Sequence, residues 1–336
     1  MSNRTISIIV AAGVLAGIGL LLVLRSTSSD TEAVQATTST TTTPMTTSDP
    51  TTTTTSAVDE GFPVTVDAPN GPVTIDERPT RIVSISPTST EVLFAVGAGG
   101  QVIAVDDQSN FPAEAPVTDI SGFTPNVEAI AALDPDLVFL SFDPGDVIAG
   151  LEAVGIPVIL HGSALSLDEA YAQWEQVGVA TGNIAEAVAL VASTQESIAS
   201  AVASLPGDTN GLSYYYELDP TFYSATSSTF VGELFALTAM TNIADEGDPD
   251  GFGFPQLTSE YIVDSDPSLI YLADTKCCGQ NEQEVAARPG WNSMTAVSEG
   301  TVIELDDDVA SRWGPRITQL LDIVVASILD LDLVDA

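Results

Sequence analysis

The stretch RIVSISPTSTE, residues 81–91, holds the local signals that decide the fold. Its first half is an apolar, β-branched run typical of a buried strand, and its second half carries the signals of a helix start. Thr88 and Glu91 match a capping box, and helix initiation alone would explain Glu91. The stretch therefore predicts a strand, a turn and a helix in direct succession.

Strands that alternate with helices are also predicted further along, in two separate parts of the chain. Further strands are predicted at 102–105, 137–140 and 156–160, with helices at 127–133 and 147–154. A similar pattern returns at 228–237, 257–263 and 269–272. Strands that alternate with helices of this length indicate right-handed crossovers and parallel sheets. We therefore predict an α/β fold of two similar lobes with mostly parallel sheets.

Residues 166–205 predict one long rigid helix that joins the lobes. Ser166 and Glu169 form a capping-box pattern, and only Gly178 and Gly182 interrupt the helical composition. A helix of roughly 40 residues would be about 60 Å long, so we expect it to brace the back of the molecule and leave a cleft. The N-terminal lobe is then 61–165 and the C-terminal lobe 206–336.

The first sixty residues predict a tether. After a short tail at 1–5, residues 6–24 carry no charge and are long enough, at about 28 Å as a helix, to span a bilayer. A cleaved signal peptide is the alternative interpretation. Residues 25–60 are rich in threonine and predict a disordered stalk. The flanking charges place the large domain on the extracytoplasmic side, held in the cell membrane by a single pass.

Composition excludes several classes of function. The formal net charge of −39, with eight basic residues, excludes nucleic acid as a partner. One histidine and two adjacent cysteines cannot supply a zinc or manganese site, so we predict neither a metal nor a cofactor.

His161 follows the apolar run at 156–160, either as a satisfied strand-end residue or as a ligand contact in the cleft. No G-x-S-x-G elbow is present, and no enzyme activity is predicted.

Four segments stand out in order and spacing: 78–91 with Gly97, 133–138, 288–291 with 296–297, and 311–316. Together they resemble the periplasmic-binding domain of ABC importers for iron-siderophores, haem and cobalamin. The resemblance covers roughly residues 63–332 and implies two lobes, a shallow cleft, little hinge motion and no catalysis. Its implied partners are a small chelate, an ABC permease and the ATPase of that permease, and we expect a monomer.

The resemblance also implies how the protein meets its permease. In this family one glutamate at the tip of each lobe docks onto basic residues of the permease, and Glu91 and Glu233 occupy the matching positions. Glu233 has no capping explanation, because Phe230 stands three residues before it. We therefore predict that both carboxylates orient the loaded receptor.

Candidate ligand contacts come from loops beyond the carboxyl ends of strands, where open α/β sheets bind ligands. Aromatic residues there offer flat apolar contact, with ordinary packing as the alternative, and an arginine could grip a carboxylate or phosphate. Cys277 and Cys278 form either a vicinal disulfide that makes a stiff apolar corner or two inert thiols. The candidates are Phe123, Phe142, Tyr216, Cys277 and Cys278, joined by Arg312 and Trp313 through family position.

The ligand itself is not named by these patterns. Few basic residues argue against a strongly anionic ferric siderophore, and a single histidine argues against histidine-ligated haem. A stalked cell-surface interaction module that reuses the same fold is the alternative function, and permease and ATPase genes beside this one would favour the importer.

Overall fold

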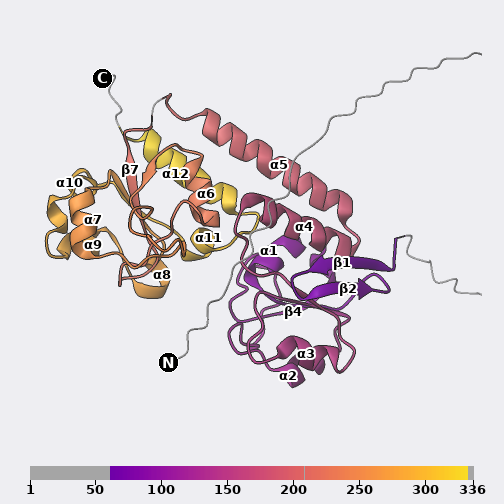
Figure 1. Cartoon of the computed structure of the whole chain (residues 1–336). Coiled ribbons are helices and arrows are strands. Elements are labelled where there is room, and N and C mark those ends of the chain that lie inside the picture. The colour runs from indigo at the N-terminus through magenta and orange to yellow at the C-terminus, as the bar shows by residue number, and fades with distance from the viewer. Residues whose placement is uncertain (1–60, 208, 332–336) are drawn as a thin grey trace, which may run out of the picture. The chain divides into compact units, whose positions relative to one another are not determined.

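The computed structural model describes residues 61–207 and 209–331 (Figure 1). The predicted anchor at 6–24 and stalk at 25–60 lie outside the described residues. Within the described ranges, no helix is both long and apolar enough to cross a bilayer.

The N-terminal lobe is built on a four-stranded parallel sheet with the order β4-β3-β5-β6. Every residue of the central strands β3 and β5 is buried, as their continuous apolar runs predict. The strands are β3 (Ile82–Ile85), β4 (Val102–Val105), β5 (Leu137–Leu140) and β6 (Val158–Leu160). The helices are α1 (Pro87–Ala95), α2 (Val127–Ala131) and α3 (Val147–Glu152), with a 3-10 turn at Gly99–Gln101. An antiparallel hairpin, β1 (Val64–Ala68) and β2 (Gly71–Ile75), precedes them.

The C-terminal lobe repeats this topology in a second four-stranded parallel sheet, with the order β10-β9-β7-β8. In both sheets the first strand in sequence lies between the second and the third, and the fourth is at the edge. The strands are β7 (Ser213–Glu217), β8 (Thr241–Asn242), β9 (Leu269–Leu272) and β10 (Val302–Glu304). The helices are α6 (Phe230–Ala236), α7 (Ser259–Ser265), α8 (Thr275–Cys278), α9 (Glu282–Ala287), α10 (Thr295–Glu299), α11 (Asp307–Ser311) and α12 (Ile317–Leu329), with a 3-10 turn at Trp291–Ser293. The prediction of parallel α/β lobes of similar build is confirmed.

The connection between the lobes differs from the prediction. Residues 166–205 form two helices, α4 (Leu167–Thr181) and α5 (Ile184–Ala203), so the single long helix is wrong. Gly182 ends α4 in the left-handed region at φ 73°, a conformation that glycine adopts without steric cost. At Gly178 a side chain would collide with Ala187 of α5, so this glycine allows the two helices to pack closely.

Helix α5 and the C-terminal helix tie the lobes together. Figure 1 shows α5 running from α4 towards α12, against which it packs. The largest apolar cluster includes Leu93 of α1, Trp174 of α4 and Leu321 of α12, so one core is continuous between the lobes on this side. Trp174 is fully buried, and its indole Nε1–H donates to the carbonyl of Trp313 at 3.0 Å.

Candidate ligand-binding site

A pocket of about 250 Å³ lies between the carboxyl edge of the N-terminal sheet and helix α11. Its N-terminal wall follows the ends of three neighbouring strands, β3, β4 and β5, where parallel strands of an open sheet present their loops to a ligand. Its opposite wall comes from α11 and the residues directly after it. The lining residues are Ser86, Pro87, Thr88, Asp106, Gln108, Gly122, Phe123, Ser141, Phe142, Asp308, Ser311, Arg312 and Trp313.

The structure brings four of the predicted contact residues into this one pocket. Phe123, Phe142, Arg312 and Trp313 all line it, although 189 positions separate Phe123 from Arg312 in sequence. The Trp313 indole is oriented by a hydrogen bond from Nε1 to Oε1 of Gln173, at 2.7 Å. Their contact with a ligand stays a prediction.

Exposed phenylalanines gather in loops that follow the carboxyl ends of strands. Among the described residues five are exposed, and each lies in the loop after β4, β5 or β8. Solvent-facing phenylalanine at the binding edge of a sheet is a typical feature of a ligand-binding surface. The sequence analysis identified two of them and missed the other three. The five are Phe111, Phe123, Phe142, Phe252 and Phe254.

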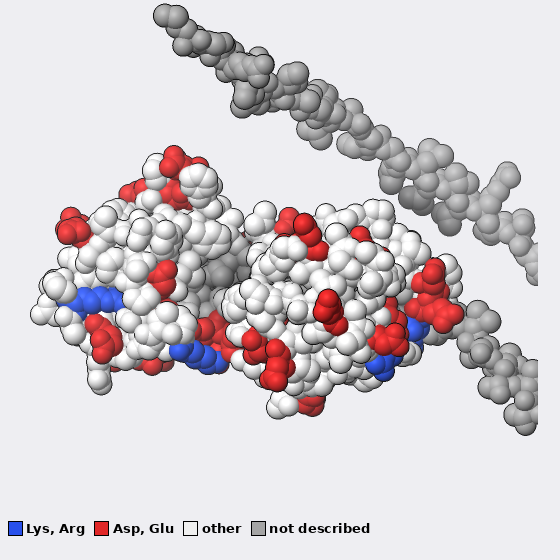
Figure 2. All heavy atoms as spheres, turned by 90° about the horizontal axis from the view of Figure 1, so that it is seen from below, with Lys and Arg blue, Asp and Glu red and all other residues white. Residues whose placement is uncertain are grey.

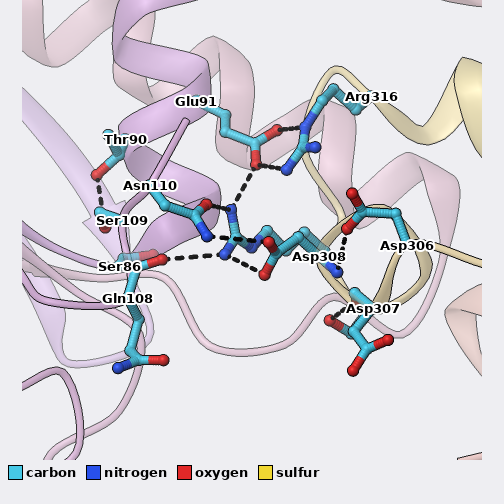
Figure 3. Close-up of polar contacts among 12 residues, drawn as sticks. Ser86, Thr90, Glu91, Gln108, Ser109, Asn110, Asp306, Asp307, Asp308 and Arg316 are labelled. Carbon is cyan, nitrogen blue, oxygen red and sulfur yellow. Dashed lines mark hydrogen bonds and ion pairs between the residues drawn. The ribbon is translucent and has the colours of Figure 1, made fainter. Parts of the chain in front are cut away.

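One carboxylate joins the two lobes beside the pocket. Glu91 of α1 accepts Nη1–H of Arg312 at 3.0 Å, and it accepts Nε–H and Nη2–H of Arg316 at 3.0 and 2.6 Å (Figure 3). Arg316 also stacks over the Phe111 ring at 4.3 Å. We call Glu91, Arg312 and Arg316 the inter-lobe bridge. Its geometry is multidentate and largely shielded from water, the arrangement in which ion pairs fix an orientation most strongly.

Arg312 is the basic side chain that lines the pocket, and its terminal nitrogens already have protein acceptors. Besides Glu91, Nη1 donates to Oδ1 of Asn110, while Nη2 donates to the Gln108 carbonyl and to Oδ1 of Asp308. Only 9% of its side chain is exposed. Arg312 therefore holds the lobes together in this structure, and its contact with a carboxylate or phosphate of the ligand stays a prediction.

The structure also corrects the interpretation of Glu91. Helix α1 begins at Pro87 with Ser86 as its N-cap, so Thr88 and Glu91 form no capping box. Glu91 is 3% exposed and lies in the inter-lobe bridge, so it is not the exposed tip carboxylate that the docking prediction requires. Only its ion-pair partners, more than two hundred residues away, reveal this role.

Glu233 takes a different position from Glu91. It is half-buried, and its Oε2 accepts the backbone N–H of Leu167 at 2.7 Å, at the first turn of α4. A carboxylate is favourable there because the N-terminus of a helix presents unpaired N–H groups and a partial positive charge. Glu233 therefore has a structural role. The sequence analysis tested only for a capping box with the residue at position 230, so it did not predict this contact with α4. Its docking on a permease stays a prediction.

Two further candidates lie away from the pocket. Tyr216 is fully buried in the C-terminal lobe, where its hydroxyl donates to the carbonyl of Ala310 at 3.0 Å, so its prediction as a cleft residue is wrong. Cys277 and Cys278 are joined as the predicted vicinal disulfide, in exposed helix α8. They do not line the pocket, although neighbouring Lys276 contacts Asp308, which does.

His161 is a structural residue rather than a ligand contact. It is 2% exposed, and its Nε2 lies 3.0 Å from Oε1 of Gln176. Burial lowers the pKa of His161 to about 4, so the imidazole is neutral at physiological pH. Across residues 61–207 and 209–331 no group of three or more His, Cys, Asp or Glu side chains is placed to hold a metal ion.

Asp106 is one of the pocket residues that the sequence analysis missed. It directly follows β4 and is fully buried; its Oδ1 accepts the N–H groups of Gln108 and Ser109, at 2.9 and 2.7 Å. Its Oδ2 has no hydrogen-bond partner among the described atoms. Burial raises the pKa of Asp106 above its ordinary value, because the charged form has lost water. A buried, unpaired carboxylate oxygen in a pocket wall is costly to stability and marks a candidate contact point.

Larger hollows elsewhere fit a ligand less well. One of about 670 Å³ lies near the amino-terminal ends of the N-terminal strands, lined by residues such as Asp76, Glu77 and Pro157, and no aromatic side chain lines it. Ligands of open α/β sheets bind at the opposite, carboxyl edge. The smaller pocket with its exposed phenylalanines is therefore the better candidate.

Comparisons with known proteins agree with this architecture. The sequence matches the periplasmic binding protein family over residues 82–309. An uncharacterized ABC transporter substrate-binding lipoprotein of Bacillus subtilis is 32% identical over 280 residues, covering 80% of this chain and 86% of the relative. A cobalamin-binding protein of Halobacterium salinarum is 29% identical over 270 residues, covering 77% and 72%. A periplasmic heme-binding protein from Roseiflexus shares the fold at a TM-score of 0.66 and 24% identity, covering 75% of this chain and 98% of that one.

Proposed function

The chain belongs to the periplasmic binding protein family, and from this premise we propose that it is the solute-binding receptor of an ABC importer for a cobalamin-like chelate. The receptor captures the chelate at the pocket between the lobes and delivers it to a membrane permease. The relative from Halobacterium salinarum is named for cobalamin binding, which supports a corrin-type ligand over the other chelates of the family.

The observation that carries this proposal is the pair of exposed phenylalanines, Phe123 and Phe142, in the lining of the pocket. A corrin ring presents a broad, partly apolar face, and phenylalanine rings offer matching flat contact with little conformational entropy to lose. Haem held by an axial histidine is disfavoured, because His161 is buried on Gln176 and does not line the pocket. A cavity of about 250 Å³ is below the usual range for drug-sized ligands, so a chelate must extend out of it across the exposed rings.

We propose that the receptor works on the extracytoplasmic side, tethered by the helix at 6–24 and the stalk at 25–60. The relative from Bacillus subtilis is named a lipoprotein, whereas the only cysteines of this chain are Cys277 and Cys278. An apolar helix followed by a flexible stalk would keep the receptor within linker reach of its permease without a lipid.

Hand-over would use Glu233. It is half-buried with one oxygen committed to Leu167, so its other oxygen can meet a basic residue of the permease. Glu233→Ala should therefore lower uptake and leave ligand affinity unchanged; full uptake by this variant would contradict the docking role.

Thermal-shift screening of the purified chain tests the ligand class directly. A ligand that binds the folded state raises its midpoint in proportion to the logarithm of ligand concentration. We expect cyanocobalamin to raise the midpoint at micromolar concentration, and haem to leave it unchanged. A shift by haem or a ferric siderophore alone would contradict the corrin assignment.

A further inference from the structure

The basic side chains of the described residues are all engaged with protein acceptors. Figure 2 shows acidic side chains spread over both lobes, with few basic ones among them. Each basic side chain has a hydrogen bond or an ion pair within the protein, and of these side chains only Arg312 lines the pocket. They are Arg78, Arg81, Lys276, Arg288, Arg312 and Arg316.

The pocket itself carries more acid than base. Arg312 is its single basic lining residue, and Asp106 and Asp308 are its two acidic ones. Asp308 is matched by Arg312 and Lys276, at 2.6 and 3.0 Å. Asp106 has no cationic partner, and its Oδ2 accepts no hydrogen bond from the described protein. The unmatched charge of the pocket is therefore negative and sits on Asp106.

We propose that this pocket selects ligands that carry hydrogen-bond donors and no net negative charge, and that Asp106 is the acceptor that sets this preference. The inference rests on the proposed receptor function and names the chemical class of its ligand. Primary carboxamide or ammonium N–H groups suit Asp106, because each satisfies the free Oδ2 lone pairs without adding a second anion to a shielded site. A ligand carboxylate near Asp106 would meet like charge at reduced dielectric and find no free cation.

The local backbone shows how a donor would reach this oxygen. Gly122 lies against the Asp106 carboxylate, and a side chain there would approach Oδ2 within 3.3 Å. The next residue, Phe123, is 65% exposed. The turn therefore covers the Asp106 carboxylate with glycine alone and holds the Phe123 ring in solvent.

A matched pair of probes tests the preference on the full-length chain. Cyanocobalamin carries neutral carboxamides, and its monocarboxylic acid replaces one of them with a carboxylate at nearly the same shape. We expect wild-type protein to bind the amide form at least about tenfold more tightly in calorimetric titration. Asp106→Asn should remove most of that preference, whereas Asp119→Asn, which removes an exposed carboxylate that does not line the pocket, should keep it.

The outcomes separate this inference from the proposed function. Equal wild-type affinity for the two corrinoids, or an undiminished preference in Asp106→Asn, overturns the inference while the receptor function stands. If neither corrinoid binds, the corrin assignment fails, and the charge preference is then decided with cationic ferrioxamine B against its N-succinyl derivative. Absence of binding by all four probes overturns both proposals.

Discussion

Glu91 of α1 and Arg316 at the start of α12 form a bidentate ion pair between the lobes, with Arg316 Nε and Nη2 3.0 and 2.6 Å from the two carboxylate oxygens. The Glu91 side chain is 1% exposed and that of Arg316 12%. Removal of one partner from such a pair leaves an uncompensated charge in a shielded site, which costs far more than loss of a surface ion pair.

Glu91→Gln should therefore destabilise the protein by about 3 kcal/mol, because Arg316 loses its carboxylate partner and Arg312 keeps only Asp308. Chemical denaturation measures this loss. Glu128→Gln on exposed α2 is the matched control and should change the free energy of unfolding by less than about 0.5 kcal/mol. Equal effects of the two substitutions would show that the bridge contributes nothing to stability.

Acid should destabilise the protein through His161. Because burial lowers its pKa to about 4, the unfolded chain takes up a proton below about pH 6.5 while the folded chain does not. The stabilisation is complete above pH 6.5 and is lost as the pH falls to 4, by on the order of 3 kcal/mol. In unfolding curves measured from pH 7 to 4, His161→Gln should lose less stability than wild type. Parallel losses would contradict this account.

Asp274 should have the opposite effect on the pH dependence of stability. It is fully buried, and neither carboxylate oxygen has a hydrogen-bond partner among the residues that the structure describes; burial together with the charge of Glu217 raises its pKa to about 7. The folded state therefore keeps the proton longer than the unfolded state, so stability falls as the pH rises from about 4 through 7.

Substitution of Asp274 isolates this effect. The stability of Asp274→Asn relative to wild type should increase by a few kcal/mol between pH 4 and pH 8, since the amide cannot ionise. Exposed Asp250→Asn is the control and should give a flat difference. A flat difference for Asp274→Asn as well would show that its carboxyl group ionises normally.

The break between α4 and α5 depends on one glycine. Gly182→Ala should cost about 1 kcal/mol, because alanine is strained at φ 73° and its methyl group would come within 3.2 Å of Arg78 Nε. Gly207→Ala, where nothing lies within 4 Å and the backbone is not left-handed, should be nearly neutral. A neutral effect at both positions would mean that the break tolerates any residue.

The regular elements were predictable because their signals are local. The apolar runs at 102–105 and 137–140 match β4 and β5 residue for residue. The break at Gly182 was not predictable, because glycine within a helical pattern is tolerated until packing between two helices selects the left-handed turn. The β1–β2 hairpin was missed although it has a local signal: Asn70-Gly71 lies at the turn between two short runs of alternating apolar residues.

The site was predictable in its location and only partly in its residues. Phe123 and Phe142, chosen because they follow strands, do line the pocket, yet the same rule misplaced Tyr216, which is fully buried. The direction of a side chain at a strand end depends on which face of the sheet it leaves. Glu91 and Arg312 were assigned to outside partners because an ion pair between residues 221 positions apart leaves no trace in local sequence. Asp106 could have been chosen as a candidate by its position, because it directly follows β4.

Calorimetric titration of cyanocobalamin tests the central claim, that the inter-lobe pocket is the ligand site, most directly when a pocket variant is compared with a distant one. We expect saturable 1:1 binding by wild type, at least tenfold weaker binding by the double variant Phe123→Ser with Phe142→Ser, and unchanged binding by Val188→Ser, which alters an exposed apolar residue on α5. Wild-type affinity in the double variant would contradict the account.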